Sequence, residues 1–308
     1  MSLFPKNAES ELDMLPRNKG SKIFIVDPVN GSDSNPGTKF EAPLLTLPAA
    51  YALCTTEMND TIILVGEATA AVQTAAFAWA KDYTHLIGLG ATTPNTPTAK
   101  IVSPAALATT PAYNFTGDGC IVKNVTFQHG SSNAASLVAV ALTGATNYFE
   151  NVHFKGGMTA AGYVNGSYSL SMTGAVGNYF KHCTFGQDEV AAPTGVGPLG
   201  MFTATARNTW EDCVFLVAPS NAGAFWVELG AAGNASWNLW RNCMFLNTSA
   251  TGMTVGVVFG GGHPATSRLY FDNCWWEGAT DFAVDASSFM NMSITTGATT
   301  SGKLIVCT

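Results

Sequence analysis

The acidic residues of this chain are its main candidates for acid–base chemistry, and that chemistry would be cleavage of a sugar polymer. Hydrolysis of a glycosidic bond uses two carboxylates, about 5 to 9.5 Å apart, that face the same sugar. The candidate carboxylates are Asp188 with Glu189, Glu228, and Glu277 with Asp281 and Asp285. Glu228 is the best catalytic candidate, because Phe225 and Trp226 precede it and could stack on a sugar ring.

The sequence around each of these carboxylates favours a structural role. Asp188 and Glu189 are adjacent, so their side chains would diverge on a strand, and the glycines and prolines around them predict a solvated loop. Glu228 also fits an outward-facing position on a strand. The three acidic residues near the C-terminus fit a polar end of the fold. We therefore assign no catalytic residue and expect no enzymatic activity.

The cysteines and histidines have no spacing typical of a metal or cofactor site. Four of the seven cysteines lie 30, 30 and 31 residues apart, which is no zinc-binding spacing, so we expect free, buried thiols. Four of the five histidines, His85, His129, His153 and His263, have no acidic or serine partner at a motif spacing. No phosphate-binding loop or nucleophile elbow is present. The sequence predicts neither a metal nor a cofactor.

Composition argues against two further classes of function. Charged residues make up 11% of the chain, against ~25% in typical soluble proteins. The net charge is −7, so the basic surface that nucleic acids require is missing. No apolar run approaches the ~20 residues of a membrane span, and the first residues contain no apolar signal segment. We expect a protein made in a host cytoplasm, with a neutral surface that tolerates packing against other subunits.

A repeated block organises the middle of the chain. Its six copies are residues 121–127, 148–154, 179–185, 209–215, 239–245 and 270–276. Their closing aromatic residues lie 27, 31, 30, 30 and 31 residues apart. A nearly fixed period of this length indicates a solenoid in which each repeat forms one coil.

Three positions of the block are apolar in every copy. The second position is Val122, Phe149, Phe180, Trp210, Trp240 and Phe271, and the last is Phe127, Phe154, Phe185, Phe215, Phe245 and Trp276. The fifth position is Val125, Val152, Cys183, Cys213, Cys243 and Cys274. Columns that stay apolar on every coil predict the inside of a stacked tube.

The second and fifth positions are an odd number of residues apart, so a straight strand could not turn both inward. The chain must therefore bend between them. The residue just before the fifth position is Asn124, Asn151, His182, Asp212, Asn242 and Asn273. Asn, Asp and His are the non-glycine residues most enriched at positive φ. The column predicts a left-handed corner on each coil, and it gives His182 and Asp212 a structural role.

The third position of the block alternates in charge. It reads Lys123, Glu150, Lys181, Glu211, Arg241 and Asp272. Coils of a parallel stack are ~4.8 Å apart, so each charge would lie between two opposite charges. Such a ladder would fix the register of the coils. Together the columns predict an all-β fold, a single-stranded right-handed parallel β-helix of ~30-residue coils.

The ends of the chain predict different structures. Residues 1–22 predict a polar N-terminal arm, and residues 23–308 predict one β-helix domain, most regular at about 100–290. Residues 46–54 predict a short helix that covers the N-terminal end of the core, with Pro48 in its first turn. We expect less regular opening coils at 61–65, 85–89 and 100–102, and a last strand at 303–306.

Three segments carry a family resemblance. Residues 26–33 (VDPVNGSD), 43–48 (PLLTLP) and 59–65 (NDTIILV), followed by coils containing Asn-Cys-x-Phe, resemble the pectate-lyase-like superfamily of parallel β-helices. The resemblance covers residues ~23–290 and implies the fold. It leaves the activity open, because the superfamily contains lyases, hydrolases, phage tailspikes and non-enzymatic virion proteins. The acidic calcium site and arginine base of the lyases have no match here.

These features favour a non-enzymatic bacteriophage virion protein, a homotrimeric capsid decoration (cement) protein or a short spike. Residues 1–22 would dock it to the major capsid protein or another virion protein. Neutral segments that could contact a second copy are 160–162, 191–192 and 223–224. The alternative is a carbohydrate-binding or polysaccharide-degrading tailspike or lyase, with Glu228 as its best candidate. Head and tail locations stay open.

Overall fold

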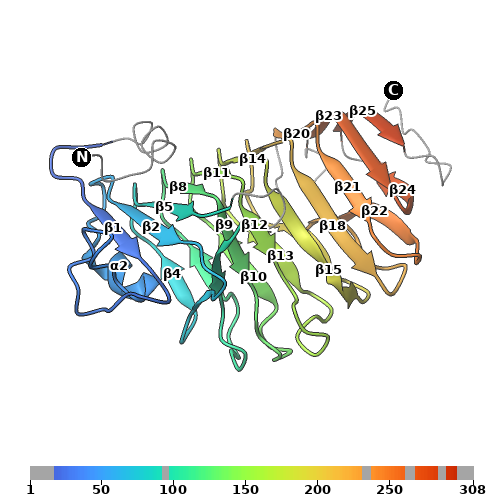
Figure 1. Cartoon of the computed structure of the whole chain (residues 1–308). Coiled ribbons are helices and arrows are strands. Elements are labelled where there is room, and N and C mark those ends of the chain that lie inside the picture. The colour runs from blue at the N-terminus through green and yellow to red at the C-terminus, as the bar shows by residue number, and fades with distance from the viewer. Residues whose placement is uncertain (1–16, 92–96, 231–236, 261–267, 284–288, 297–308) are drawn as a thin grey trace.

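The protein is an all-β, right-handed parallel β-solenoid of about six turns with one short helix, as predicted. The computed structural model describes residues 17–91, 97–230, 237–260, 268–283 and 289–296. The coils are stacked from the N-terminal to the C-terminal end (Figure 1), and each passes through three walls. Every strand pair is parallel, and partner strands lie one coil apart.

The strands of each wall pair in chain order. The first wall consists of β1 (Ile23–Val26), β2 (Thr61–Val65), β5 (His85–Leu89), β8 (Ile121–Lys123), β11 (Tyr148–Glu150), β14 (Tyr179–Lys181), β17 (Thr209–Glu211), β20 (Asn238–Arg241) and the start of β23 (Arg268–Glu277), with β25 (Phe289–Thr296) paired to β23. The second wall consists of β3 (Ala71–Val72), β6 (Ala99–Val102), β9 (Val125–Gln128), β12 (His153–Lys155), β15 (Thr184–Ala192), β18 (Val214–Pro219), β21 (Met244–Asn247) and the end of β23. The third wall consists of β4 (Phe77–Trp79), β7 (Tyr113–Phe115), β10 (Val138–Leu142), β13 (Tyr168–Met172), β16 (Gly197–Met201), β19 (Val227–Leu229), β22 (Met253–Phe259) and β24 (Ala279–Ala283).

The predicted inward columns form the core. All their members are buried, and rings of successive coils stack with centroids 4.9 Å apart for Phe149 and Phe180 and 4.5 Å for Trp210 and Trp240. The six described cysteines are free and buried, as expected; Cys307 lies outside the described residues. The cysteine column therefore fills the core as small apolar groups.

The predicted corner is present on every coil of the repeat. All six residues of its column have φ between 51° and 56° and join the first wall to the second. The charge column is in register, with Glu150 opposite Lys181 and Glu211 opposite Arg241. Its closest ion pair joins Lys123 Nζ and Glu150 Oε2, 2.9 Å apart.

A ladder of buried asparagines, which the sequence pattern did not reveal, lies inside the solenoid. It consists of Asn147, Asn178, Asn208 and Asn238, each 0–1% exposed. Each side-chain oxygen accepts a hydrogen bond from the backbone N–H one coil earlier, for example Asn208 Oδ1 from Asn178 N at 2.9 Å. Each side-chain N–H₂ donates to a carbonyl of the previous coil, which satisfies polar groups that the turn would otherwise bury unpaired.

The N-terminal end is covered by α2 (Leu47–Leu53), as predicted. Thr46 caps the helix by accepting a hydrogen bond from Ala49 N, and Leu47 and Ala50 are buried. Parallel pairing already begins at β1, so the opening coils belong to the same walls as the repeat. The arm lies outside the described residues as far as residue 16, and so does the predicted strand 303–306. No helix among the described residues is long and apolar enough to cross a membrane.

Candidate functional site

The groove around Glu228 lies on the outer face of the third wall. Two glycines of β16 leave room there for aromatic rings of the neighbouring coils. A Cβ atom at Gly197 would lie 2.3 Å from the ring of Phe225, and one at Gly200 would lie 2.9 Å from the ring of Tyr168. Because both side chains are absent, the Tyr168 ring lies across β16 and its hydroxyl donates a hydrogen bond to Glu228 Oε2 on β19.

The groove is open and mostly neutral. Its volume is about 420 Å³, and small or polar residues line it beside Glu228, among them Asn165, Thr194, Ala222 and Thr254. Burial and the Glu228 carboxylate raise the pKa of Tyr168 well above its usual value, so the phenol stays protonated and remains a donor. Amide and hydroxyl groups around one carboxylate suit hydrogen bonding to a polyhydroxylated ligand.

The structure corrects one part of the prediction for this site. Phe225 and Trp226 are 3% and 0% exposed, so neither ring can stack on a bound sugar. Trp226 packs inside the solenoid, with its ring centroid 5.8 Å from that of Phe245. Glu228 does face outward on its strand, as the structural interpretation expected. Within the described residues that line the groove, Glu228 is the single carboxylate.

The other candidate carboxylates are not brought to this groove. Asp188 and Glu189 belong to β15, so the predicted loop is wrong; a register shift in this strand leaves both side chains exposed. Glu189 forms an ion pair with Lys155, 2.6 Å apart. The C-terminal trio is divided: Glu277 ends β23, Asp281 lies on β24 in the third wall, and Asp285 is outside the described residues.

The described residues contain no cluster of three or more His, Cys, Asp or Glu side chains suited to a metal ion. His85 and His129 are buried and bonded to neutral side chains, Nε2 of His85 to Asn59 Oδ1 at 3.1 Å and Nε2 of His129 to Ser136 Oγ at 2.9 Å. His263 lies outside the described residues.

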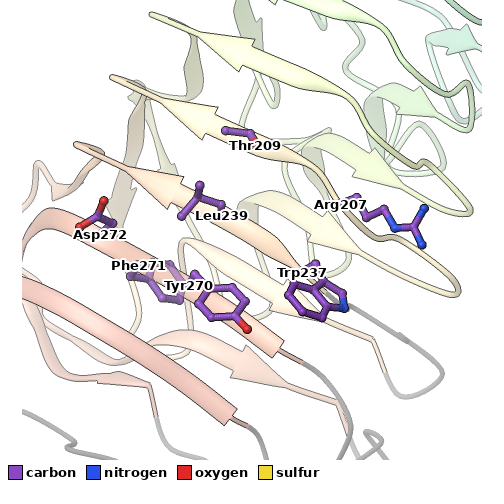
Figure 2. A pocket seen from close by; sticks show the side chains of 7 residues that line it. All are labelled: Arg207, Thr209, Trp237, Leu239, Tyr270, Phe271 and Asp272. Atoms are coloured by element: carbon purple, nitrogen blue, oxygen red, sulfur yellow. The ribbon is translucent and has the colours of Figure 1, made fainter.

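A second hollow, not predicted from the sequence, lies on the outer face of the first wall (Figure 2). Its volume is about 480 Å³. Trp237 is 59% exposed, and its ring centroid lies 6.2 Å from that of Tyr270 on the next coil. Thr209 and Leu239 form the floor between the aromatic residues Tyr179 and Tyr270 of the same outward column, and Arg207 lies on the coil before Trp237.

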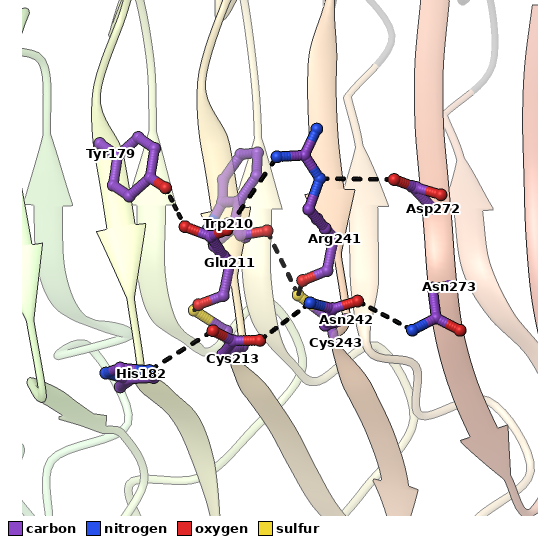
Figure 3. A network of polar contacts seen from close by, with 11 residues as sticks. Tyr179, His182, Trp210, Glu211, Cys213, Arg241, Asn242, Cys243, Asp272 and Asn273 are labelled. Atoms are coloured by element: carbon purple, nitrogen blue, oxygen red, sulfur yellow. Dashed lines mark hydrogen bonds and ion pairs between the residues drawn. The ribbon is translucent and has the colours of Figure 1, made fainter.

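A network of polar contacts borders this hollow (Figure 3). Arg241 Nε lies 3.4 Å from Asp272 Oδ2, and its Nη1 lies 4.0 Å from Glu211 Oε1. Glu211 also accepts a hydrogen bond from the Tyr179 hydroxyl. Burial and this carboxylate raise the pKa of Tyr179 to about 12. The charges at this edge are therefore paired with one another between coils.

The corner residues form a parallel row in the same view. His182 Nε2 lies 3.4 Å from Asp212 Oδ2, and Asn242 Nδ2 donates to Asp212 Oδ1 at 3.1 Å. The row continues through Asn273 Nδ2, which donates to Asn242 Oδ1 at 2.9 Å. These contacts agree with the structural role predicted for His182 and Asp212.

Several solved structures share this fold at low sequence identity. The chain is similar to pectate lyase Pel9A (TM-score 0.56, 15% identity, covering 94% of this chain and 80% of that one). It is similar to the pectin methylesterase from Aspergillus niger (0.54, 14%, covering 94% and 92%) and to a rhamnogalacturonan lyase (0.51, 13%, covering 84% and 74%). No family model and no curated protein sequence matches the chain. The neighbours are pectate-lyase-like parallel β-helix proteins, and the likeness extends to the fold alone.

Proposed function

We propose that this chain is a non-catalytic structural protein of a bacteriophage particle, which assembles as a homotrimeric capsid decoration protein or short spike. The observation that carries the proposal is an apolar stripe on the outer face of the second wall. The stripe consists of Val214, Leu216, Met244, Leu246 and Trp275. Residues 1–22 would dock the trimer to the major capsid protein or another virion protein.

On a face open to water, polar side chains would be exposed and apolar ones buried, and this face has the opposite pattern. On the N-terminal coils its outward residues are polar yet buried: Thr126, His153 and Thr184 are 1%, 4% and 2% exposed. On the C-terminal coils the same column holds Val214, Met244 and Trp275, of which Met244 is 41% exposed and the others are half-buried. Contiguous apolar side chains that stay partly exposed on several coils are typical of an interaction surface.

A second copy of the chain is the partner that fits this stripe best. The stripe follows the solenoid axis over three coils, so its partner must also extend along that axis. Another solenoid packed side by side meets this condition, and closed cyclic symmetry is the usual arrangement of soluble homo-oligomers. The low charge of the chain, 11% of residues, limits repulsion between copies.

We expect Met244→Lys to weaken the trimer. A lysine in the middle of the stripe would place an unpaired ammonium in an apolar interface, so the association constant should fall on the order of 100-fold or more. Sedimentation velocity would measure the change, and circular dichroism would check that each chain stays folded. Thr280→Lys, an exposed position on β24 in the third wall, is the matched control and should leave the trimer intact.

Each other outcome contradicts a defined part of the proposal. A wild-type protein that sediments as a monomer would refute the trimer. A trimer that both variants leave unchanged would refute the stripe as its interface. A monomer that Met244→Lys destabilises would show that the chain covers the stripe itself.

The second candidate is a glycan-binding or glycan-cleaving protein, which the groove at Glu228 favours. Its neutral polar lining suits a sugar, and the structural neighbours carry names of pectin-acting enzymes. A single carboxylate, however, does not supply the pair that glycoside hydrolysis uses. This is why catalysis is the second choice.

We expect no cleavage of polygalacturonate or of neutral polysaccharides, measured as release of reducing ends and of unsaturated products. Glu228→Gln should therefore change nothing in these assays. Asp188→Asn, which alters an exposed carboxylate outside the groove, is the control. Turnover that Glu228→Gln removes and Asp188→Asn retains, at equal thermal stability, would establish the second candidate instead.

A further inference from the structure

Trp237 and Arg207 occupy turn positions whose backbone conformation disfavours large side chains. Each lies directly before an asparagine of the buried ladder, in a column that also contains Thr146 and Gly177. All four have positive φ: 55°, 71°, 57° and 63° from Thr146 to Trp237. Glycine adopts this conformation freely, whereas a bulky residue does so at an energetic cost.

A strained position that keeps a large exposed side chain points to a role outside the fold. Trp237 is 59% exposed, so burial in the core does not explain its size. Its ring lies beside that of Tyr270, and the two rings are inclined by 32°. The pair forms an aromatic platform at the edge of the second hollow, beside the small floor made by Thr209 and Leu239 (Figure 2).

The charge of the hollow is set by Arg207. Asp272, the acidic residue in the lining, is engaged by Arg241 at 3.4 Å. Among the described residues, Arg207 is exposed and forms no ion pair. Its guanidinium is therefore available as a planar donor that can bind a carboxylate through two parallel hydrogen bonds.

We propose that this hollow is a non-catalytic binding site for an anionic saccharide. The ring faces of Trp237 and Tyr270 pack against the C–H face of a sugar ring, and Arg207 binds its carboxylate. The site is distinct from the groove at Glu228, which lies on the third wall. It adds glycan recognition to the proposed structural role and does not depend on that role.

The chemistry of the hollow favours a saccharide over other anions. A nucleic acid would also offer rings and negative charge, but the protein has a net charge of −7 and places one unpaired cation here. The hollow is open and rigidly held by paired strands, which suits a sugar ring presented from a polymer. An aromatic surface and an unpaired guanidinium in one lining are the combination that an acidic sugar needs.

The test uses Trp237→Gly and the full-length protein. Binding of hexasaccharides of galacturonate and of hyaluronan would be followed by calorimetry, with maltohexaose as the neutral probe. The wild-type protein should bind at least one anionic probe saturably and more tightly than maltohexaose. Trp237→Gly should weaken that binding about tenfold or more. Its thermal midpoint should stay equal or rise, because glycine relieves the positive φ.

Two further variants complete the design. Arg207→Gly should remove the preference for the anionic probe over maltohexaose, again without loss of stability. Tyr83→Gly is the matched control, since Tyr83 is also an exposed aromatic residue at positive φ (51°) but lies outside the hollow. Its binding should equal that of the wild-type protein.

The proposal is overturned if the wild-type protein binds neither anionic probe at millimolar concentration. It is also overturned if Trp237→Gly binds as the wild type does. A variant that loses stability without any binding by the wild type would assign Trp237 to the fold. Because neither readout involves oligomeric state or cleavage, these outcomes are independent of the trimer and of Glu228.

Discussion

Asn208→Ala is expected to lower the free energy of unfolding by about 3 to 5 kcal/mol. The Asn208 side chain accepts hydrogen bonds from Asn178 N (2.9 Å) and Asn178 Nδ2 (3.1 Å), and it donates to Ala175 O (3.0 Å) and Asn238 Oδ1 (3.1 Å). Alanine would leave the Asn178 N–H buried without an acceptor. Removing the partner of a buried donor costs about 1 to 3 kcal/mol, and the other lost bonds add to it.

Asn242→Ala is the matched control. Asn242 also belongs to an asparagine ladder, with bonds to Asp212 and Asn273, but it is exposed at the corner, where water can replace them. Its loss should be about 1 kcal/mol, mainly the cost of alanine at positive φ. Urea denaturation of the three proteins in parallel measures the difference. Equal losses, or a larger loss for Asn242→Ala, would show that the buried ladder contributes little.

Much of this fold could be predicted because the repeat places one residue type in one environment on every coil. Phe149 and Phe180 stack because both occupy the second position of the block, and the period alone aligns them. The corner was equally readable, since Asn124 and Asn151 occupy a position where two inward columns demand a bend. Stacked copies act as an internal comparison that an isolated coil would not provide.

The buried ladder was missed because its column is incomplete. Cys120 and Leu269 occupy the same place directly before the first and last copies of the block. Asn178 follows Gly177, and this pair reads as an ordinary turn. A spacing of 31, 30 and 30 residues from Asn147 to Asn238 was the signal that could have revealed it. A regular spacing of one residue type indicates a ladder. The Gly and Asn residues of a turn do not indicate whether the ladder's side chains face inward.

The two hollows were harder to predict, since both depend on which way a side chain points after a turn. Trp226 and Val227 are consecutive yet both buried, so alternation fails just before Glu228. Tyr168 reaches Glu228 from two coils earlier, because Gly200 leaves the intervening coil open. Glycines inside a strand can mark such close approaches, and Gly197 and Gly200 were the residues that could have predicted this one. A comparison of equivalent positions on successive coils does not reveal a contact between side chains that lie two coils apart.

Stability is expected to fall as the pH is lowered from 6.5 to 4, because two buried histidines are held neutral. Burial lowers the pKa of His85 and of His129 from 6.5 to about 4. His85 Nδ1 accepts a hydrogen bond from Ile121 N at 3.1 Å, and protonation would abolish that acceptor. The unfolded chain binds more protons throughout this window, so its free energy falls relative to that of the folded state. The full effect is about 3 kcal/mol for each histidine, about 2 of it already lost at pH 5.

The pH interval from 6.5 to 5 isolates the histidines from the carboxylates. Lys123 holds the pKa of Glu150 below its usual value of 4.5, so that ion pair weakens only at lower pH. Urea denaturation at several pH values should give a clear loss across the upper interval, and a flat profile there would contradict the neutral, buried state. In His129→Gln the slope should be smaller than that of the wild type, because one of the titrating groups is removed, whatever the variant's stability at neutral pH.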